Sequence, residues 1–324
     1  MTTASTQEWA VTHYRVTPGT YLSRDPDNGS PVATLANSKS FRLGGDLGHL
    51  CELVASDASA PSATALLAKL GPDWDTESVS RGLAALTGAG IVADAQRVDE
   101  LEAAGARPSR FAFRAPFSLQ WNLADPAGFC RRLRPVAPLL RGRTGLILST
   151  IGAAIQVFAL VRNPLPALSS LGPVQFALVG FALLVLVAIH ELAHGTVLSA
   201  AGGRPRRLGF MLYYLTPGFF CDVSDSWRLG RRTRIDVALA GVASQCQVGA
   251  LAALPLLLGA PGASALVWLM VFNLACAATN LLPLLKLDGY LALMAAVGIP
   301  NLRSRAMGAW RDTLRRLAGL PTEE

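Results

Sequence analysis

Four long stretches of mostly apolar residues constrain this chain more than any other feature of its sequence. A helix needs about 20 such residues to cross a bilayer, and the stretches approach or exceed that length. Hydrophobic residues make up 51% of the 324 residues, which is high for a soluble protein. The sequence therefore predicts a mainly helical fold, a polytopic membrane bundle of about four spans. The predicted spans lie near residues 145–161, 174–199, 236–259 and 264–285.

Basic residues alternate from one connection to the next along this predicted bundle. Arginines cluster before the first span, between the second and third spans, and in the tail after residue 300, whereas the two other connections have none. Positively charged loops tend to stay in the cytoplasm. We therefore expect a multi-pass protein of the cytoplasmic membrane, surrounded by the lipid bilayer, with both termini and the connection 202–234 on the cytoplasmic side.

The charges separate an acidic first third from a basic remainder. Residues 1–115 carry 10 Lys/Arg and 13 Asp/Glu, whereas the other residues carry 19 and 9. This favours a soluble domain followed by a membrane region over a nucleic-acid-binding protein. We expect a domain over 1–100, a linker and interfacial segment over 101–140, a membrane domain over 141–300 and a basic cytoplasmic tail over 301–324.

A small α+β, winged-helix-like fold is predicted for the first domain. Its helical segments place apolar residues on one face, and Asp75 or Thr76 serves as an N-cap. A winged helix often binds DNA, but this one is acidic and has no arginine cluster on a recognition helix, so we expect no nucleic-acid partner. In chain order the elements are strands 14–17 and 41–43, helices 45–54, 62–70 and 76–86, and a strand from 91.

The cysteines and the N-terminus bear on the compartment. The five cysteines are scattered, odd in number and without a C-x-x-C pair, so they predict no disulfide framework and favour a reducing surrounding for the soluble part. The first residues have neither a basic start nor an apolar core. We therefore expect no signal peptide, and insertion through the internal spans. The cysteines are Cys51, Cys130, Cys221, Cys246 and Cys276.

The second predicted span contains the sequence HELAH at residues 190–194. On a helix this spacing places His190 and His194 one above the other, where they can hold one Zn²⁺, with Glu191 as general base. A lone histidine in an apolar helix is usually a packed core residue, but here two of the chain's four histidines occur together. Ionisable groups inside a span cost about 2.5–3.5 kcal/mol each and mark function by default. The motif therefore indicates a zinc hydrolase.

A catalytic zinc site needs a third protein ligand and an open position. The membrane half has no further histidine, and Asp288 is the best candidate. It follows the cytoplasmic end of the fourth predicted span, at a depth similar to that of His190 and His194. An Asp-Gly pair at a helix end is also typical of a simple turn. Cys221 and Asp222 are a weaker alternative pair of ligands.

Two motifs together resemble those of the site-2-protease family of intramembrane zinc metalloproteases. The H-E-x-x-H motif is followed by N-x-x-P-x-x-x-x-D-G in a later span. In this chain the second motif consists of Asn280, Pro283, Asp288 and Gly289. The resemblance covers roughly residues 140–300.

This resemblance implies a role for each matching residue. His190, His194 and Asp288 would be the zinc ligands, and Glu191 would be the general base. Asn280 would help to hold the scissile peptide or its oxyanion, although an Asn in a span also commonly bonds a neighbouring helix.

The connection between the second and third spans has a further pattern. Aromatic and β-prone residues around Pro217 and Gly218, within 209–227, favour a hairpin or re-entrant loop beside the zinc, and this resembles the bacterial branch called peptide zinc metalloproteases. Such an edge would suit substrate binding by strand addition, and an interfacial aromatic belt is an equal alternative. The chain departs from the family at 241–245, where it reads GVASQ and many members carry Gly-Pro and an Asn.

The first domain resembles the precursor-recognition domains of ribosomally made peptide (RiPP) pathways. The resemblance rests on Phe41-Arg-Leu43, on the helix with Leu47 and Leu50, and on the pattern over 83–92. It implies that an extended leader peptide binds by adding a strand to the domain edge. We therefore expect a zinc endopeptidase that removes the leader of a precursor peptide, as in daptide-like maturation. Other peptide-maturation enzymes or an exporter would be its partners.

Two alternatives stay open. One is regulated intramembrane proteolysis of a membrane-bound regulator, such as an anti-sigma factor, or of a signal-peptide remnant. The other is a membrane scaffold that binds peptide or metal without cleaving. The intact Glu191 argues against the scaffold, because metal binding alone does not need a base at that position.

Overall fold

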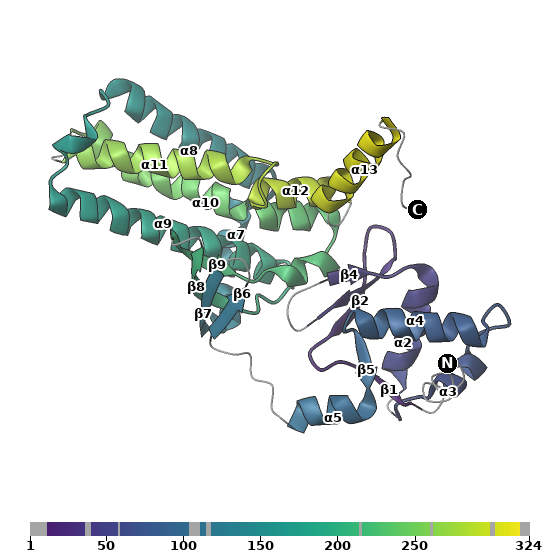
Figure 1. Ribbon diagram of the computed structural model, residues 1–324. Coiled ribbons are helices and arrows are strands. Elements are labelled where there is room, and N and C mark those ends of the chain that lie inside the picture. The colour runs from purple at the N-terminus through teal and green to yellow at the C-terminus, as the bar shows by residue number, and fades with distance from the viewer. Residues whose placement is uncertain are drawn as a thin grey trace. The chain divides into compact units, whose positions relative to one another are not determined.

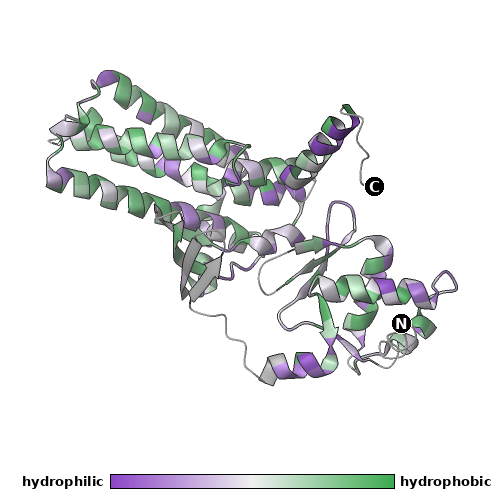
Figure 2. Cartoon of the chain, viewed as in Figure 1, coloured by the Kyte–Doolittle hydropathy of each residue, from purple (hydrophilic) through white to green (hydrophobic). Residues whose placement is uncertain are grey.

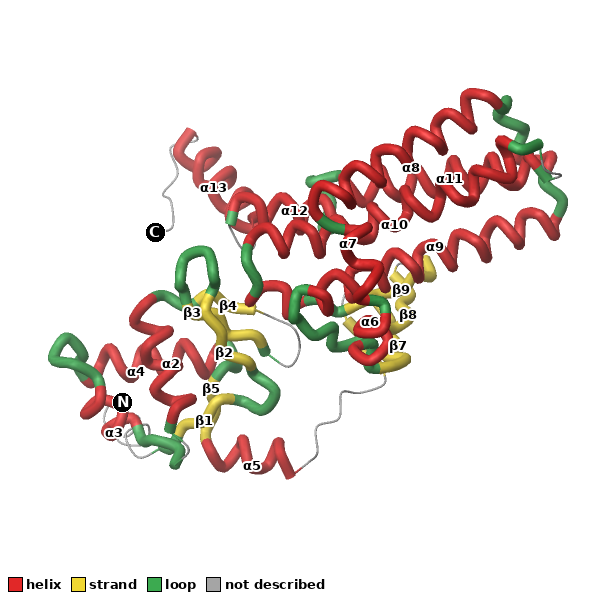
Figure 3. Tube along the Cα trace, turned by 180° about the vertical axis from the view of Figure 1, so that it is seen from behind, coloured by secondary structure: helices red, strands yellow, loops and turns green. Residues whose placement is uncertain are grey.

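The computed structural model of this chain is mainly helical, with a small N-terminal region of short strands and helices and four helices long and apolar enough to cross a membrane. This is the fold class that the apolar stretches predict. Figures 1 and 3 show the elements from opposite sides. The described residues are 12–35, 40–57, 59–103, 111–114, 118–213, 216–259, 262–298 and 302–317. Residues 1–11 of the predicted domain and 318–324 of the predicted tail lie outside them.

The chain forms two compact units. The first comprises residues 1–125 together with 203–217 and 222–230. The second comprises residues 126–202, 218–221 and 231–324. Part of the connection that follows the HELAH helix thus packs with the N-terminal residues.

Two small antiparallel sheets and three helices form the N-terminal region. One sheet has the order β2-β3-β4 and the other pairs β1 with β5. The second and third helices begin at polar caps, since Ser62 accepts the N–H of Ala65 and Asp75 accepts that of Ser78. The elements are β1 (Tyr14–Val16), β2 (Tyr21–Arg24), β3 (Pro31–Thr34), β4 (Ser40–Arg42), α2 (Gly45–Ser56), α3 (Ala63–Lys69), α4 (Thr76–Gly88) and β5 (Val92–Asp94), followed by α5 (Ala95–Ala103).

The core of this region is apolar. Leu50, Leu66 and Leu83 come from three different helices and are almost completely buried, together with Val92 of β5. Their spacing within each helix is the one on which the sequence prediction rested. Burial of this shared face holds α2, α3 and α4 together.

A third sheet joins segments that are far apart in the sequence. Its strand order is β6-β7-β8-β9. β7 pairs antiparallel with both β6 and β8, and Trp121 of β7 lies beside Phe210 of β8 with ring centroids 5.7 Å apart. Part of the segment predicted as a linker is therefore strand. The bounds are β6 (Phe111–Arg114), β7 (Ser118–Ala124), β8 (Leu208–Tyr213) and β9 (Thr216–Cys221).

The four long helices pack into a bundle with one of them at its centre. Of the 18 most apolar consecutive residues of α10, 67% are buried, whereas the corresponding share in the other three long helices is 22–28%. Figure 2 shows apolar residues over most of these helices. Short helices, α6 (Ala127–Arg132), η1 (Arg134–Val136) and α7 (Ala137–Leu140), precede the bundle, and η2 (Leu168–Ser170) and η3 (Ser224–Arg228) lie in its connections. The long helices are α8 (Gly142–Arg162), α9 (Pro173–Ala200), α10 (Arg231–Leu257) and α11 (Ala263–Leu281).

The end of the fourth long helix differs from the prediction. It ends at Leu281 instead of residue 285, because Pro283 lacks an N–H and disfavours a helical conformation at Leu282. A short apolar helix, α12 (Asp288–Val297), follows, and then α13 (Leu302–Leu317). Gly289 lies so close to the backbone of Leu281 that a side chain there would overlap it. This close approach places Asp288 beside the end of α11.

Candidate metal centre

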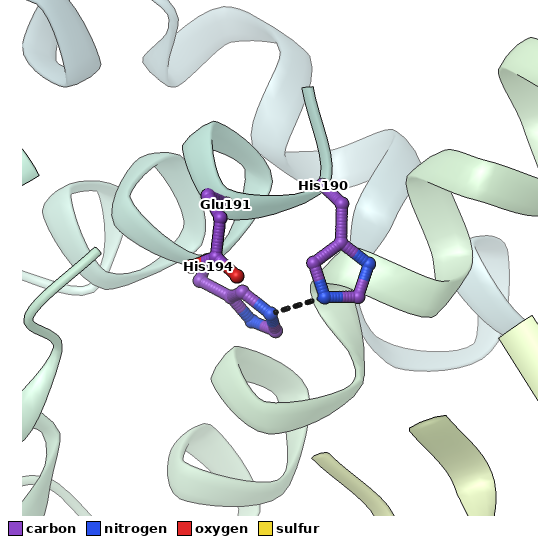
Figure 4. Close-up of side chains that lie close together, drawn as sticks. All are labelled: His190, Glu191 and His194. Carbon is purple, nitrogen blue, oxygen red and sulfur yellow. Dashed lines mark hydrogen bonds between the residues drawn. The ribbon is translucent and has the colours of Figure 1, made fainter. Parts of the chain in front are cut away.

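His190 and His194 face one another inside the bundle (Figure 4). Both lie on α9, one helical turn apart, and they are 4% and 5% exposed. Their Nε2 atoms are 3.1 Å apart. Together with Glu191 they form a group of potential metal-binding side chains, as the HELAH motif predicts.

The opposite ring nitrogens show which atom of each imidazole carries the proton. Nδ1 of His194 is 2.6 Å from the backbone carbonyl of Val237, and Nδ1 of His190 is 3.0 Å from Oε1 of Gln245. A carbonyl oxygen can only accept, so both Nδ1 atoms donate. In the neutral imidazole each Nε2 then presents a lone pair to the space between the two rings.

Asp288 adds a third acceptor to the same space. Its Oδ2 lies 3.0 Å from Nε2 of His190 and 3.4 Å from Nε2 of His194. This oxygen is buried and has no hydrogen-bond donor among the described residues. With both imidazoles neutral, three lone-pair atoms, one of them anionic, converge in this space, which is unfavourable unless a cation lies there.

The spacing of these atoms fits a zinc ion. Bonds of about 2.0–2.1 Å to a tetrahedral Zn²⁺ place any two ligand atoms about 3.3 Å apart. The three observed distances of 3.0, 3.1 and 3.4 Å agree with this geometry. The donor set of two imidazoles and a carboxylate is also one that zinc prefers and that leaves a position open.

Glu191 lies beside this group and is held by the backbone. Its Oε2 accepts the N–H of Cys221, the last residue of β9, at 2.8 Å. One of its carboxylate oxygens is within 4.8 Å of a ring nitrogen of each histidine. The glutamate is thus oriented next to the convergent atoms and also contacts a strand.

One face of α10 shapes the site from the other side. Val237, Gly241 and Gln245 are spaced four residues apart, so they lie along one face of that helix. A Cβ atom at Gly241 would lie 2.5 Å from Nε2 of both His190 and His194. Only glycine leaves room there for the space between the two imidazoles.

The other predicted residues have different surroundings. Asn280 is half-buried near the end of α11, and the described residues give it no hydrogen bond to His190, Glu191 or His194. The carboxylate of Asp222 pairs with the guanidinium of Arg207 at 3.0 Å and accepts the N–H of Ser224. This ion pair occupies Asp222, the alternative ligand considered from the sequence.

Sequence reasoning assigned no role to three buried amides in the bundle, although Gln245 belongs to the 241–245 segment that departs from the family. Gln156, Gln245 and Asn273 are at most 2% exposed and lie on α8, α10 and α11. A polar amide within an apolar span is a signal that was available, because such groups need partners inside the bundle.

Comparison with known proteins gives no matching family model, no matching curated protein and no matching solved structure.

Proposed function

We propose that this protein is a zinc endopeptidase of the site-2-protease type, with His190, His194 and Asp288 as the metal ligands. The convergence of three potential ligand atoms at 3.0–3.4 Å is the observation that supports this most strongly. A bound Zn²⁺ would supply a Lewis acid that polarises the scissile carbonyl and activates water.

Glu191 acts as the general base in this proposal. It takes a proton from the attacking water as the oxygen bonds to the peptide carbonyl carbon, and it delivers the proton to the leaving nitrogen as the C–N bond breaks. The hydrogen bond from Cys221 orients the carboxylate for both transfers. Asn280 stays a candidate for binding the scissile peptide, because it lies near the C-terminal end of α11, and Asp288, the first residue of α12, lies beside that end.

A peptide substrate suits the strand that contacts the base. β9 is an edge strand in the order β6-β7-β8-β9, and its last residue donates to Glu191. An extended peptide that adds to such an edge is held through its backbone, independently of its sequence. The same contact would bring a peptide bond close to Glu191.

We further propose that the N-terminal domain binds the leader of a ribosomally made precursor peptide, and that leader removal is the physiological reaction. β4 is an edge of the β2-β3-β4 sheet and is followed directly by α2, α3 and α4, which supports strand addition near Phe41. Free leader peptide added in trans should then raise the apparent KM for a precursor and leave cleavage of a short peptide that lacks the leader unchanged. Equal KM values would favour regulated proteolysis of a membrane-bound regulator or signal-peptide remnant.

The cytoplasmic membrane is the proposed location, with both termini in the cytoplasm. The support is the charge pattern, since arginines gather in alternate connections of four helices that can span a bilayer. Cysteine labelling at Ser169 and Ser226, on either side of α9, should report opposite faces. Labelling of both from one face would contradict the four-span topology.

The Glu191→Gln variant tests the proposed reaction. The amide cannot accept a proton, so we expect cleavage of a proteome-derived peptide library to fall by at least about 100-fold, read by mass spectrometry. Zinc content should stay at the wild-type value, because the three ligands are intact. Asp312→Asn, on α13, is the control and should keep full activity.

Two outcomes would count against this proposal. Substantial turnover by Glu191→Gln with zinc bound would remove Glu191 from the reaction. Zinc binding by the wild type without any cleavage would favour the non-enzymatic scaffold.

A further inference from the structure

We infer that Gln245, held in place by Asn273 and Gln156, is a positioning residue that orients His190 for the metal. This inference rests on the proposed zinc site and adds to it three residues from three different helices. None of them belongs to the two motifs in the sequence.

Gln245 contacts His190 directly. Its Oε1 accepts from Nδ1 of His190 at 3.0 Å, and its side chain is buried. The acceptor keeps the proton on Nδ1, so Nε2 stays available as a ligand, and it also sets the rotation of the ring. His194 has a backbone carbonyl in the equivalent place, whereas His190 depends on a side chain.

Two further amides hold the segment of α10 that carries Gln245. The amide nitrogen of Asn273 donates to the backbone carbonyl of Gln245 at 3.1 Å and to Oε1 of Gln156 at 2.9 Å. The amide nitrogen of Gln156 donates to the carbonyl of Cys246 at 3.0 Å. Two consecutive backbone carbonyls of α10 thus accept hydrogen bonds from different helices. The carbonyl of Gln245 is bound by Asn273 of α11, and that of Cys246 is bound by Gln156 of α8.

Glycines make room for these amides. A Cβ atom at Gly249 would lie 2.5 Å from the amide nitrogen of Asn273 and would overlap the side chain of Gln156. A Cβ atom at Gly152 would overlap the carbonyl of Cys246. The helix crossing is therefore shaped to admit the amide pair, not only to pack apolar side chains.

The bonds have a consequence for the site. These hydrogen bonds fix the axial position and the rotation of α10 around Gln245, whose side chain contacts His190. Polar side chains inside a bundle contribute little to helix association on average, so a positioning role accounts better for two bonded amides that hold the backbone of α10 beside Gln245. Loss of the Gln245 side chain should weaken zinc binding. Loss of the Asn273 side chain should weaken it less, because Asn273 acts on His190 only through Gln245.

Zinc affinity in the purified full chain tests this inference, measured by competition with a chelator. For Gln245→Leu we expect an affinity about 10–100-fold below wild type, the usual effect of removing a partner of a ligating histidine. Gln247→Leu is the matched control, since Gln247 lies on the same helix and donates to Leu139 and Ser149. This control should keep the wild-type affinity.

Two more variants separate positioning from folding. Gln245→Glu keeps an acceptor oxygen and should restore affinity to within a few-fold of wild type. Asn273→Leu should lower it, and in combination with Gln245→Leu the effects should not add, because both act through one contact. If Gln245→Leu does not fold, Gln245→Asn, which keeps the amide but shortens its reach, should show the loss.

The results distinguish this inference from the zinc site itself. Equal zinc affinity in wild type, Gln245→Leu and Gln247→Leu would overturn the positioning role and leave the zinc site standing. A wild-type chain that binds no zinc would instead overturn the proposed function.

Discussion

The N-terminal region and the membrane bundle differ in where most of their apolar residues lie. In the N-terminal region the main core cluster is made of apolar residues, and ion pairs such as Arg24–Glu52 and Lys69–Asp57 lie on the surface. In the bundle, large apolar side chains such as Leu178 and Phe181 are exposed, while His190 and Gln245 are buried. The first arrangement suits water, and the second suits lipid.

The difference teaches where function is to be sought in each region. A buried polar group in a bundle surrounded by lipid needs a partner, and a cluster of them indicates a site. In a water-soluble domain the corresponding signal is a sheet edge, such as β4 among the described strands, because buried residues there mainly provide stability. Changes in the two regions should therefore have separable effects.

Gly241→Ala should have the largest effect of the variants that probe this separation. Its methyl group would lie 2.5 Å from Nε2 of both His190 and His194, so we expect zinc affinity to fall by about 100-fold, the upper end of the usual range for changes around a metal site. Gly180→Ala is the control, because a Cβ atom at that position of α9 meets nothing within 4 Å. Zinc titration of both variants checks this, and equal affinities would break the assignment of the site to this part of the bundle.

Leu50→Ala should affect the other region only. Leu50 is completely buried in the N-terminal core, so truncation should destabilise that region by about 2–5 kcal/mol. Hydrogen exchange over 45–88 should rise while zinc content stays constant. A parallel loss of zinc would mean that the two regions do not act separately.

The smallest effect concerns the thiol of Cys51. Burial, together with the charge of Glu52, raises its pKa to about 11, so the thiol stays protonated at pH 8 and should react slowly with iodoacetamide. Leu50→Ala should speed up this reaction by opening the core. Rapid alkylation of Cys51 in the wild type, read by mass spectrometry, would contradict the packing of this region.

Much of the architecture could be predicted because its signals are long or local. The four spans are recognisable from their length and hydropathy, and α2, α3 and α4 from apolar spacing and from a cap such as Asp75. The strand β6 escaped prediction because it is short, and β7 because it pairs with β8, about 90 residues away. Pairing at such distances leaves little local signal.

The site was predictable in part for the same reason. His190 and His194 share one helical turn, so spacing alone brings them together, and Asp288 was placed by topology. Gln245 could not be assigned to His190 from sequence, because the contact depends on how α10 packs against α9. The repeat of Val237, Gly241 and Gln245 becomes meaningful only when the facing helix is known.

Zinc stoichiometry of the purified protein is the most direct measurement of whether the convergent atoms hold a metal. We expect one zinc per chain in the wild type and in the control Asp312→Ala, and far less in Asp288→Ala, because the variant loses the anionic member of the three convergent atoms. Full zinc occupancy in Asp288→Ala would contradict the site described here and would require another third ligand.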